Sequence, residues 1–350
     1  MILKRIARLV LLLLPVLCVL FLLQCLFVPK YMGQIVEGAM VAEYYGEEKD
    51  HDVLFVGDCE LYENFDPVFL WQNYGINSYI RGSAQQLIWQ SYYLMEETLD
   101  YEHPQVIVFN VLSLQYDVPQ REAYNRMTLD GMRWSEWKVK DIQASMLPEE
   151  RFLDYVIPLL RYHSRWKELT AEDVKYLFHR DPVTHNGYYM RTDVLPAENV
   201  PEGRPLADYA FGENAWDYME KIRALCEREG ISLVLVKAPS LYPYWYPEWE
   251  SQVQEYAKEH HLEYYNFLDL IEETGLDFQT DTYDAGLHLN RSGADKLSAY
   301  FGRILAEGNA EYDRLPVPDR RKEQALSARG EGKIQAYEED IARQKEIKIE

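Results

Sequence analysis

Basic residues and cysteines are both scarce in this chain, and each shortage narrows the classes of protein to which it can belong. Lys and Arg number 36 against 58 Asp and Glu, which gives a formal net charge of -22. Nucleic-acid binding depends on Lys and Arg that neutralise phosphates, and flat binding to an anionic lipid surface depends on them as well. We therefore expect neither from the acidic body. Of the four cysteines, Cys18 and Cys25 lie in an apolar N-terminal segment, and only Cys59 and Cys226 lie beyond it.

The sequence also lacks the motifs that hold metals and phosphates. Its eight histidines are scattered, and the adjacent pair His260 and His261 falls at the end of a helical pattern, so no metal-ligand spacing is present. No glycine-rich loop of the phosphate-binding kind occurs, and the chain has no internal repeat. We therefore expect no metal site and no cofactor.

The first thirty residues are predicted to form a membrane anchor. Residues 9–28 are twenty residues in which only Pro15 and Gln24 interrupt the apolar run. A helix of that length spans about 30 Å, the thickness of a bilayer core. Three basic residues precede the run, which predicts a cytoplasmic N-terminus and an extracytoplasmic body. The alternative is a cleaved signal peptide, but the run ends in LLQCLFVPK, without the small residues of a cleavage site.

After a connector at residues 31–50, strand and helix patterns alternate. This alternation predicts an α/β domain over residues 51–305, with a parallel sheet in flavodoxin-like order, helices on both sides and right-handed crossovers. The expected strands are residues 52–56, 76–80, 105–112, 231–238 and 262–266. The expected helices are residues 66–75, 85–99, 216–229, 247–260 and 292–305, the last capped by Ser292.

Residues 113–210 interrupt this rhythm and are predicted to form a helical insertion. The helical patterns cover residues 136–146, 149–160 and 171–178, and irregular stretches follow. A long insertion after a central strand usually lies over the strand ends and shapes the site there. Residues 306–350 are rich in charge and are expected to be a solvated tail or a loosely docked helix.

Candidate site residues follow the strands, at the sheet edge where parallel sheets bind their ligands. The first strand leads into Gly57-Asp58-Cys59, the second into Gly82, and the third ends near Asn110. A fourth segment, YDAGLHLNRSGA at residues 283–294, arrives just before the last helix and carries Asp284 and His288.

These segments resemble the SGNH (GDSL-like) hydrolase superfamily, and within it the membrane-anchored DltD-like and alginate-acetylase-like branch. That family has a G-D-S or G-S-S nucleophile after strand one, a glycine after strand two, an Asn after strand three and a late D-x-x-H. Here Cys59 occupies the nucleophile position, Gly82 matches the glycine, and His288 matches the late histidine. The stretch GDCEL looks like the G-S-S-E-L of the DltD-like branch, which also has an N-terminal anchor and a helical insertion.

The chain departs from the family pattern in three places. The nucleophile is a cysteine instead of a serine. The spacing Asp284-x-x-x-His288 is one residue longer than usual, so Asp281 is a rival for the acidic member of the triad. Asn110 lacks the G-x-N-D setting of the family, which leaves its oxyanion role open.

A Cys-His-Asp triad is chemically reasonable at these positions. A triad needs a nucleophile, a base and an acid that orients the base. The reference pKa of a thiol, about 8.5, is much closer to neutral than that of a serine hydroxyl, so Cys59 keeps nucleophilic chemistry possible. We expect the backbone N–H groups of Cys59 and Gly82 to hold the oxyanion, with Asn110 as a third donor and Asp58 among the substrate-binding residues.

The predicted function is acyl-ester hydrolysis or acyl transfer on a cell-envelope glycan or glycopolymer. The resemblance favours transfer, with a membrane-bound O-acyltransferase as a partner. The first alternative is a catalytically inactive protein of this fold that binds glycan or assists polymer assembly. The second is a structural thiol, with Cys59 joined to Cys226 in a disulfide.

Two further clusters each allow two interpretations. The stretch SLYPYWYPEW, at residues 240–249, is either an aromatic platform for sugar rings or a rigid loop that seals the core. The stretch LLRYHSRW, at residues 159–166, contains Arg161, His163 and Arg165, which either bind an anionic polymer or pair with the protein's own carboxylates.

Overall fold

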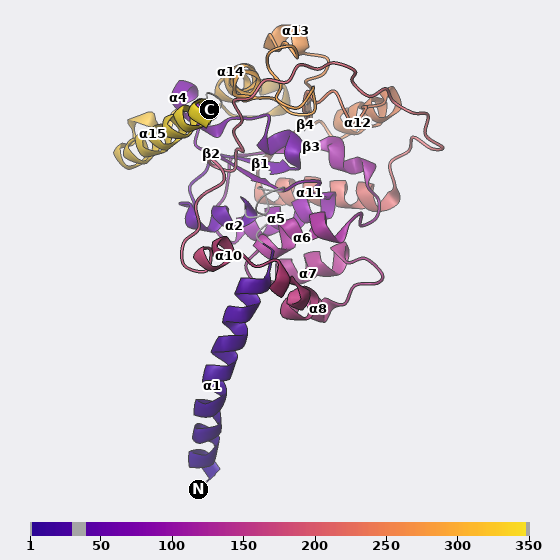
Figure 1. The fold of residues 1–350 in the computed structure, drawn as a ribbon. Helices are drawn as coiled ribbons and strands as arrows, with labels where there is room; N and C mark the ends of the chain where they lie inside the picture. Colours follow the sequence, from indigo (N-terminus) through magenta and orange to yellow (C-terminus); the bar gives the residue numbers. More distant parts are fainter. Residues whose placement is uncertain (1, 30–39, 348–350) are drawn as a thin grey trace.

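The computed structural model describes residues 2–29 and 40–347, with side chains described from Leu11 onward in the first helix. Its centre is a five-stranded parallel sheet in the order β2-β1-β3-β4-β5, which is the strand order of flavodoxin-like folds. The α/β class predicted from the sequence is therefore confirmed (Figure 1). The strands are β1 (Val53–Gly57), β2 (Ser78–Gly82), β3 (Val106–Asn110), β4 (Ser232–Lys237) and β5 (Glu263–Asn266).

Alternate residues of the strands face two separate cores, because successive side chains point to opposite faces of a sheet. Phe55 and the strand residues that face the same side of the sheet pack under α4 (Pro67–Tyr74) and α14 (Arg291–Glu307). Leu54 and the strand residues that face the opposite side pack under α5 (Ile88–Leu99), α11 (Glu213–Glu229) and α12 (Pro247–Glu259). In Figure 1, α4 and α14 lie above the sheet and α5 and α11 below it. Both faces are covered, as the continuous apolar strands predict.

The helix boundaries follow from their caps. Asp66 caps α4 by accepting hydrogen bonds from the N–H groups of Val68 and Phe69, and Gly75 ends that helix in the left-handed conformation. Helix α14 begins one residue earlier than predicted and is capped by Asn290, whose side chain accepts from the Gly293 N–H at 3.2 Å. The prediction that Ser292 caps this helix is therefore wrong.

The helical part of the insertion packs on the outer side of α5 instead of lying over the strand ends. Leu94 of α5, together with Leu129 and Ile142, forms a third, smaller core there. The irregular return segment, residues 188–197, borders the predicted site: the Tyr189 N–H donates to the Tyr62 carbonyl at 2.7 Å and the Leu195 N–H to the Thr282 carbonyl at 3.0 Å. The helix expected over residues 149–160 is broken at Pro158, which cannot continue a helix. The elements are η3 (Val111–Gln115), α6 (Glu122–Gly131), α7 (Glu136–Ser145), α8 (Phe152–Val156), α9 (Leu159–Tyr162), η4 (His163–Lys167) and α10 (Ala171–Lys175).

The C-terminal region is a docked helix, α15 (Gln324–Ile347), and not a solvated tail. Tyr337 and Ile341 are buried against the first core. The Tyr337 hydroxyl donates to Asp66 Oδ2 at 2.5 Å, and Gln344 Nε2 donates to the Met190 carbonyl at 3.0 Å. The remaining short elements are α2 (Met40–Glu43), η2 (Tyr44–Gly46), α3 (Cys59–Tyr62), α13 (Ile271–Thr274), η5 (Ala310–Tyr312) and η6 (Arg320–Lys322).

Helix α1 (Ile2–Phe27) projects from the body (Figure 1). Its apolar side chains are exposed from Leu11 to Leu23, and only residues 24–29 are half-buried. Its inner end lies against α9, η4 and α10. Among the residues that the structure describes, no helix meets the combined length and apolarity needed to cross a membrane.

Candidate functional site

Cys59 stands at the turn between β1 and the short helix α3. Asp58 caps α3 by accepting the Glu60 N–H at 3.2 Å. A Cβ on Gly57 would lie 3.0 Å from Leu61 Cδ1 and 3.1 Å from Asn110 Cβ, so a glycine lets the chain turn back closely over the sheet. The Cys59 thiol is half-buried and free. Because it is the first residue of the helix, its backbone N–H has no partner within the helix.

His288 and Asp284 form a tight pair just before α14. Asp284 Oδ2 lies 2.6 Å from His288 Nδ1, and Asp284 Oδ1 accepts the His288 backbone N–H at 2.8 Å. The rival Asp281 is engaged elsewhere, with Oδ2 accepting from Lys296 Nζ at 2.6 Å and from the Asp277 N–H at 2.8 Å. The structure therefore places Asp284, and not Asp281, on the histidine ring.

The other ring nitrogen of His288, Nε2, is buried with no hydrogen-bond partner. The Cys59 side chain lies near enough to the ring to raise the pKa of His288. Burial raises the pKa of the Cys59 thiol to about 11, against the opposing effect of a positive His288. Cys59, His288 and Asp284 thus lie in the order of a nucleophile, a base and an orienting acid.

A second carboxylate approaches the same histidine. Glu63 Oε1 lies 3.6 Å from His288 Nδ1, and the Tyr283 hydroxyl is hydrogen-bonded to Glu63 Oε2. The Tyr283 ring also stacks on the imidazole, at 6.1 Å between centroids. Burial lowers the pKa of His288, but the charges of Glu63 and Cys59 and the bond to Asp284 outweigh it and raise the pKa well above its usual value. These contacts therefore favour the protonated form of His288.

Beneath the Cys59 turn lies a buried polar cluster. Lys237 Nζ donates to Glu60 Oε1 at 2.8 Å and Oε2 at 2.9 Å, and both side chains are fully buried. Asn110 Nδ2 donates to Asp58 Oδ1 and to Glu60 Oε2, each at 3.0 Å. Both amide protons of Asn110 are thus in use, so the structure does not fit its expected role as a third oxyanion donor. Its role here is to hold two carboxylates under the turn.

The same turn accounts for the presence of an aspartate at position 58 and a glycine at position 82. Burial and the charge of Glu60 raise the pKa of Asp58 to about 7, and its carboxylate is directed to Glu60 and Asn110, as the contacts above show. Gly82 ends β2 opposite Gly57, and a Cβ there would lie 2.9 Å from the Gly57 carbonyl oxygen. The glycine is required by this close approach and not by a positive φ.

Four residues of this region were not predicted from the sequence. Glu60 and Glu63 lie in and just after α3, Tyr283 precedes Asp284, and Lys237 ends β4. One of them had a signal in the sequence. Lys237 lies inside the buried run ISLVLVKA, and a buried ammonium group is almost always paired with a carboxylate. The roles of Glu63 and Tyr283 had no local signal, because both depend on the contact between segments more than 200 residues apart.

The remaining cysteine and the two side-chain clusters are also placed. Cys226 is buried in α11 and free, so no Cys59–Cys226 disulfide is formed. In the aromatic stretch, Trp245 and Trp249 are each only 8% exposed, which favours a loop that seals the core. Arg161 pairs with Glu122 at 2.6 Å and Arg165 with Asp173 at 3.1 Å, so these cations pair with the protein's own carboxylates.

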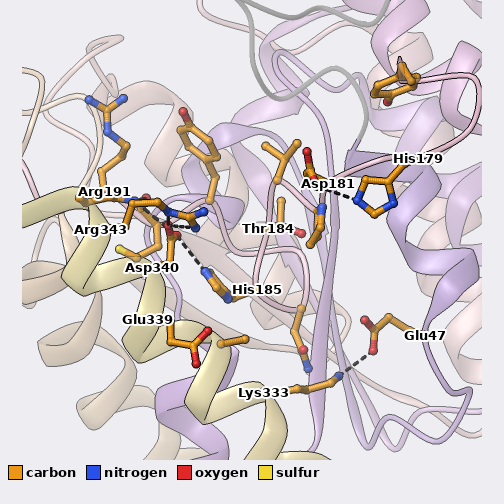
Figure 2. Close-up of a pocket in the computed structure, with 18 of the residues that line it drawn as sticks. Glu47, His179, Asp181, Thr184, His185, Arg191, Lys333, Glu339, Asp340 and Arg343 are labelled. Carbon is orange, nitrogen blue, oxygen red and sulfur yellow. Dashed lines mark hydrogen bonds and ion pairs between the residues drawn. The ribbon is translucent and has the colours of Figure 1, made fainter. Parts of the chain in front are cut away.

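A pocket of about 770 Å³ lies beside this site, between α15 and residues 172–191 (Figure 2). Several of its charged side chains pair with one another, among them His185 with Asp340 at 3.1 Å and Lys333 with Glu47 at 2.7 Å. Arg191, at one end, lies 4.7 Å over the Tyr283 ring and so links the pocket to the histidine site.

Within the described ranges, no group of three or more His, Cys, Asp or Glu side chains is arranged to hold a metal ion. Comparison of the chain with models of known protein families and with curated proteins finds no match to either.

Proposed function

We propose that this protein is an acyl-ester enzyme of the SGNH type that forms a thioester on Cys59. The observation that carries the proposal is the Asp284–His288–Cys59 arrangement at the carboxyl end of β1, with 2.6 Å between Asp284 Oδ2 and His288 Nδ1. The resemblance of GDCEL and of the late histidine segment to the SGNH superfamily, and to its DltD-like branch, supports the same assignment. The sheet order is that of the proposed fold.

The proposed reaction has two halves. The Cys59 sulfur attacks the acyl carbonyl of an ester while its proton passes to unprotonated His288 Nε2, and the oxyanion forms beside the backbone N–H groups of Cys59 and Gly82. The alkoxide leaves with the proton from His288, which leaves a thioester. Water or a sugar hydroxyl then gives its proton to His288 and attacks the thioester, and the thiol is regenerated. Asp284 holds the Nδ1 proton throughout.

Although no helix among the described residues meets the length and apolarity of a membrane span, we further propose that α1 anchors the protein in a membrane, with the body on the extracytoplasmic side. Support comes from the exposed apolar side chains of Leu11 to Leu23 and from the basic residues that precede them in the sequence. The acyl acceptor would be a cell-envelope glycan or glycopolymer, and the acyl donor would come from a membrane-bound O-acyltransferase, as the DltD-like resemblance implies.

A second candidate function is glycan binding or envelope polymer assembly by an inactive protein of this fold. One observation favours it: burial raises the pKa of the Cys59 thiol to about 11, while the pKa of His288 is raised well above its usual value. A thiolate is therefore scarce at neutral pH, and the shift on His288 favours its protonated form over the free base. The two candidates differ in whether Cys59 is ever acylated.

The test is direct detection of the acyl-enzyme. Full-length protein in detergent is incubated with an activated acetyl ester at pH 8, quenched in acid and examined by peptide mass. We expect an acetyl group on the Cys59 peptide, absent from Cys59→Ala and strongly reduced in His288→Ala. The matched control is Cys226→Ala, which removes a buried thiol distant from His288 and should leave acetylation unchanged. If the wild-type Cys59 peptide stays unmodified while its thiol is shown to be free, the inactive-protein candidate takes precedence.

The pH dependence of that acetylation provides a second prediction. Because Glu63 helps to hold the proton on His288, the wild-type rate should rise with pH as that proton is lost. Glu63→Gln removes the charge, which lowers the His288 pKa and should move the midpoint of the rise to lower pH by roughly one unit. The measurement is the acetylation rate from pH 6 to 10. Glu339→Gln, in the exposed part of α15, should leave the midpoint in place, and a midpoint unmoved by Glu63→Gln would contradict the role given to Glu63.

A further inference from the structure

The helices around the inner end of α1 expose a concentration of large apolar side chains. Outside α1, the described residues leave fifteen such side chains exposed, and seven of them fall within residues 153–178. Phe178 is 84% exposed and Trp166 is 64% exposed. We name these seven the apolar collar: Leu153, Val156, Ile157, Leu160, Trp166, Val174 and Phe178.

The apolar collar lies at a defined level along α1. Helix α1 is exposed as far as Leu23 and becomes half-buried from Gln24, where it meets α9, η4 and α10. Arg165 of η4 donates from Nη1 to the Phe27 carbonyl oxygen at 2.7 Å, which fixes η4 against the end of α1. Figure 1 shows α8 and α10 on either side of this end. The elements that carry the collar therefore lie next to the point where the exposed part of α1 ends.

The charge of this region differs from that of the rest of the chain. Residues 151–180 contain six basic and four acidic residues, whereas the whole chain has a net charge of -22. Arg151, which precedes α8, and Lys175, which ends α10, are 70% and 50% exposed and pair with Asp154 and Asp181. Trp and Phe with nearby cations are the residues that favour the boundary between lipid tails and headgroups. A surface made mainly of carboxylate side chains has neither these aromatic residues nor these cations.

We propose that the apolar collar inserts into the interfacial layer of the same bilayer that holds α1. The inference rests on the proposed membrane anchoring, and it adds a second contact that fixes the body against the lipid surface. A single helix leaves the body free to tilt, while the collar on both sides of α1 restrains it. Cys59 is then held at a constant height above the membrane, as suits an acyl donor that is delivered at the membrane.

The experiment uses full-length protein in nanodiscs of phosphatidylcholine that include an alkyne-tagged phosphatidylcholine. A photo-crosslinking p-benzoylphenylalanine replaces one residue at a time: Phe178 or Trp166 in the collar, Leu17 in α1, or Tyr244 before α12. Tyr244 is the matched control, because it is an aromatic residue 44% exposed on a segment distant from α1. After irradiation, the tagged lipid attached to the protein is quantified by gel fluorescence.

We expect lipid adducts at positions 178 and 166 to exceed those at position 244 by at least fivefold and to approach those at position 17. Adducts at 17 with none above the control level at 178 and 166 would overturn the collar while leaving the anchor in place. Absence of adducts at 17 as well would overturn the anchor and the collar together. Neither outcome bears on acetylation of Cys59, which is measured separately.

Discussion

Asp284→Asn is expected to lower the rate of Cys59 acetylation by roughly 10³-fold at pH 8. Asp284 Oδ2 accepts the proton on His288 Nδ1 and so directs Nε2 toward the thiol, whereas an asparagine amide also offers N–H groups and no longer fixes the tautomer. Loss of the acid in a serine triad costs about 10⁴-fold. We expect somewhat less here, because Glu63 at 3.6 Å still attracts the Nδ1 proton. The rate is followed by release of the activated leaving group.

Asp281→Asn is the matched control for this substitution. It changes the same chemical group three residues away, but Asp281 contacts Lys296 and the Asp277 N–H and not the histidine. We expect its acetylation rate to stay within about threefold of the wild type, although the lost ion pair lowers stability. Urea unfolding of both variants separates the two effects. The assignment of Asp284 fails if Asp281→Asn is the more damaging variant in rate while both remain folded.

The fold was predictable because its signals are local. Apolar runs such as ISLVLVKA, each bounded by turns, predict buried parallel strands, and the Asp66-Pro67 start and Gly75 end of α4 are written in adjacent residues. The insertion was harder to place. Its helices were recognisable from periodicity, but whether they cover the strand ends or α5 depends on which apolar faces meet. That is a property of tertiary packing.

The same distinction between local signals and tertiary packing applies to the residues of the candidate site. Cys59, Asp284 and His288 were predicted together because each lies in a short segment of recognisable spacing. The spacing could not decide between Asp284 and Asp281, since both precede the histidine on one loop, and only the side-chain directions separate them. Asn110 was assigned to the oxyanion by position, whereas its amide is taken by two carboxylates, one of which, Glu60, follows the nucleophile directly. The prediction for Asn110 did not take account of the charged side chains buried beneath the turn.

That buried charge leads to the largest stability effect we expect. Lys237→Met should lower the free energy of unfolding by about 3–5 kcal/mol, because it leaves the Glu60 carboxylate buried without its cation. Glu60 and Lys237 are both 0% exposed, and Nζ also donates to the Ala238 carbonyl at 2.7 Å. Methionine nearly matches the length of lysine, so the change removes charge with little loss of volume. Urea unfolding of the full chain in detergent, followed by circular dichroism, gives the measurement.

The double variant Glu60→Gln/Lys237→Met distinguishes lost charge pairing from lost packing. Glutamine keeps an oxygen for Asn110 Nδ2 but carries no charge, so the double variant should recover at least half of the stability lost by Lys237→Met alone. If the double variant is no more stable than the single one, packing and not charge explains the loss. The pair also bears on Cys59: Lys237 lowers the pKa of Asp58, so its removal favours a protonated Asp58 at neutral pH. A protonated cap accepts the Glu60 N–H less strongly, and the turn that presents the thiol should loosen with it.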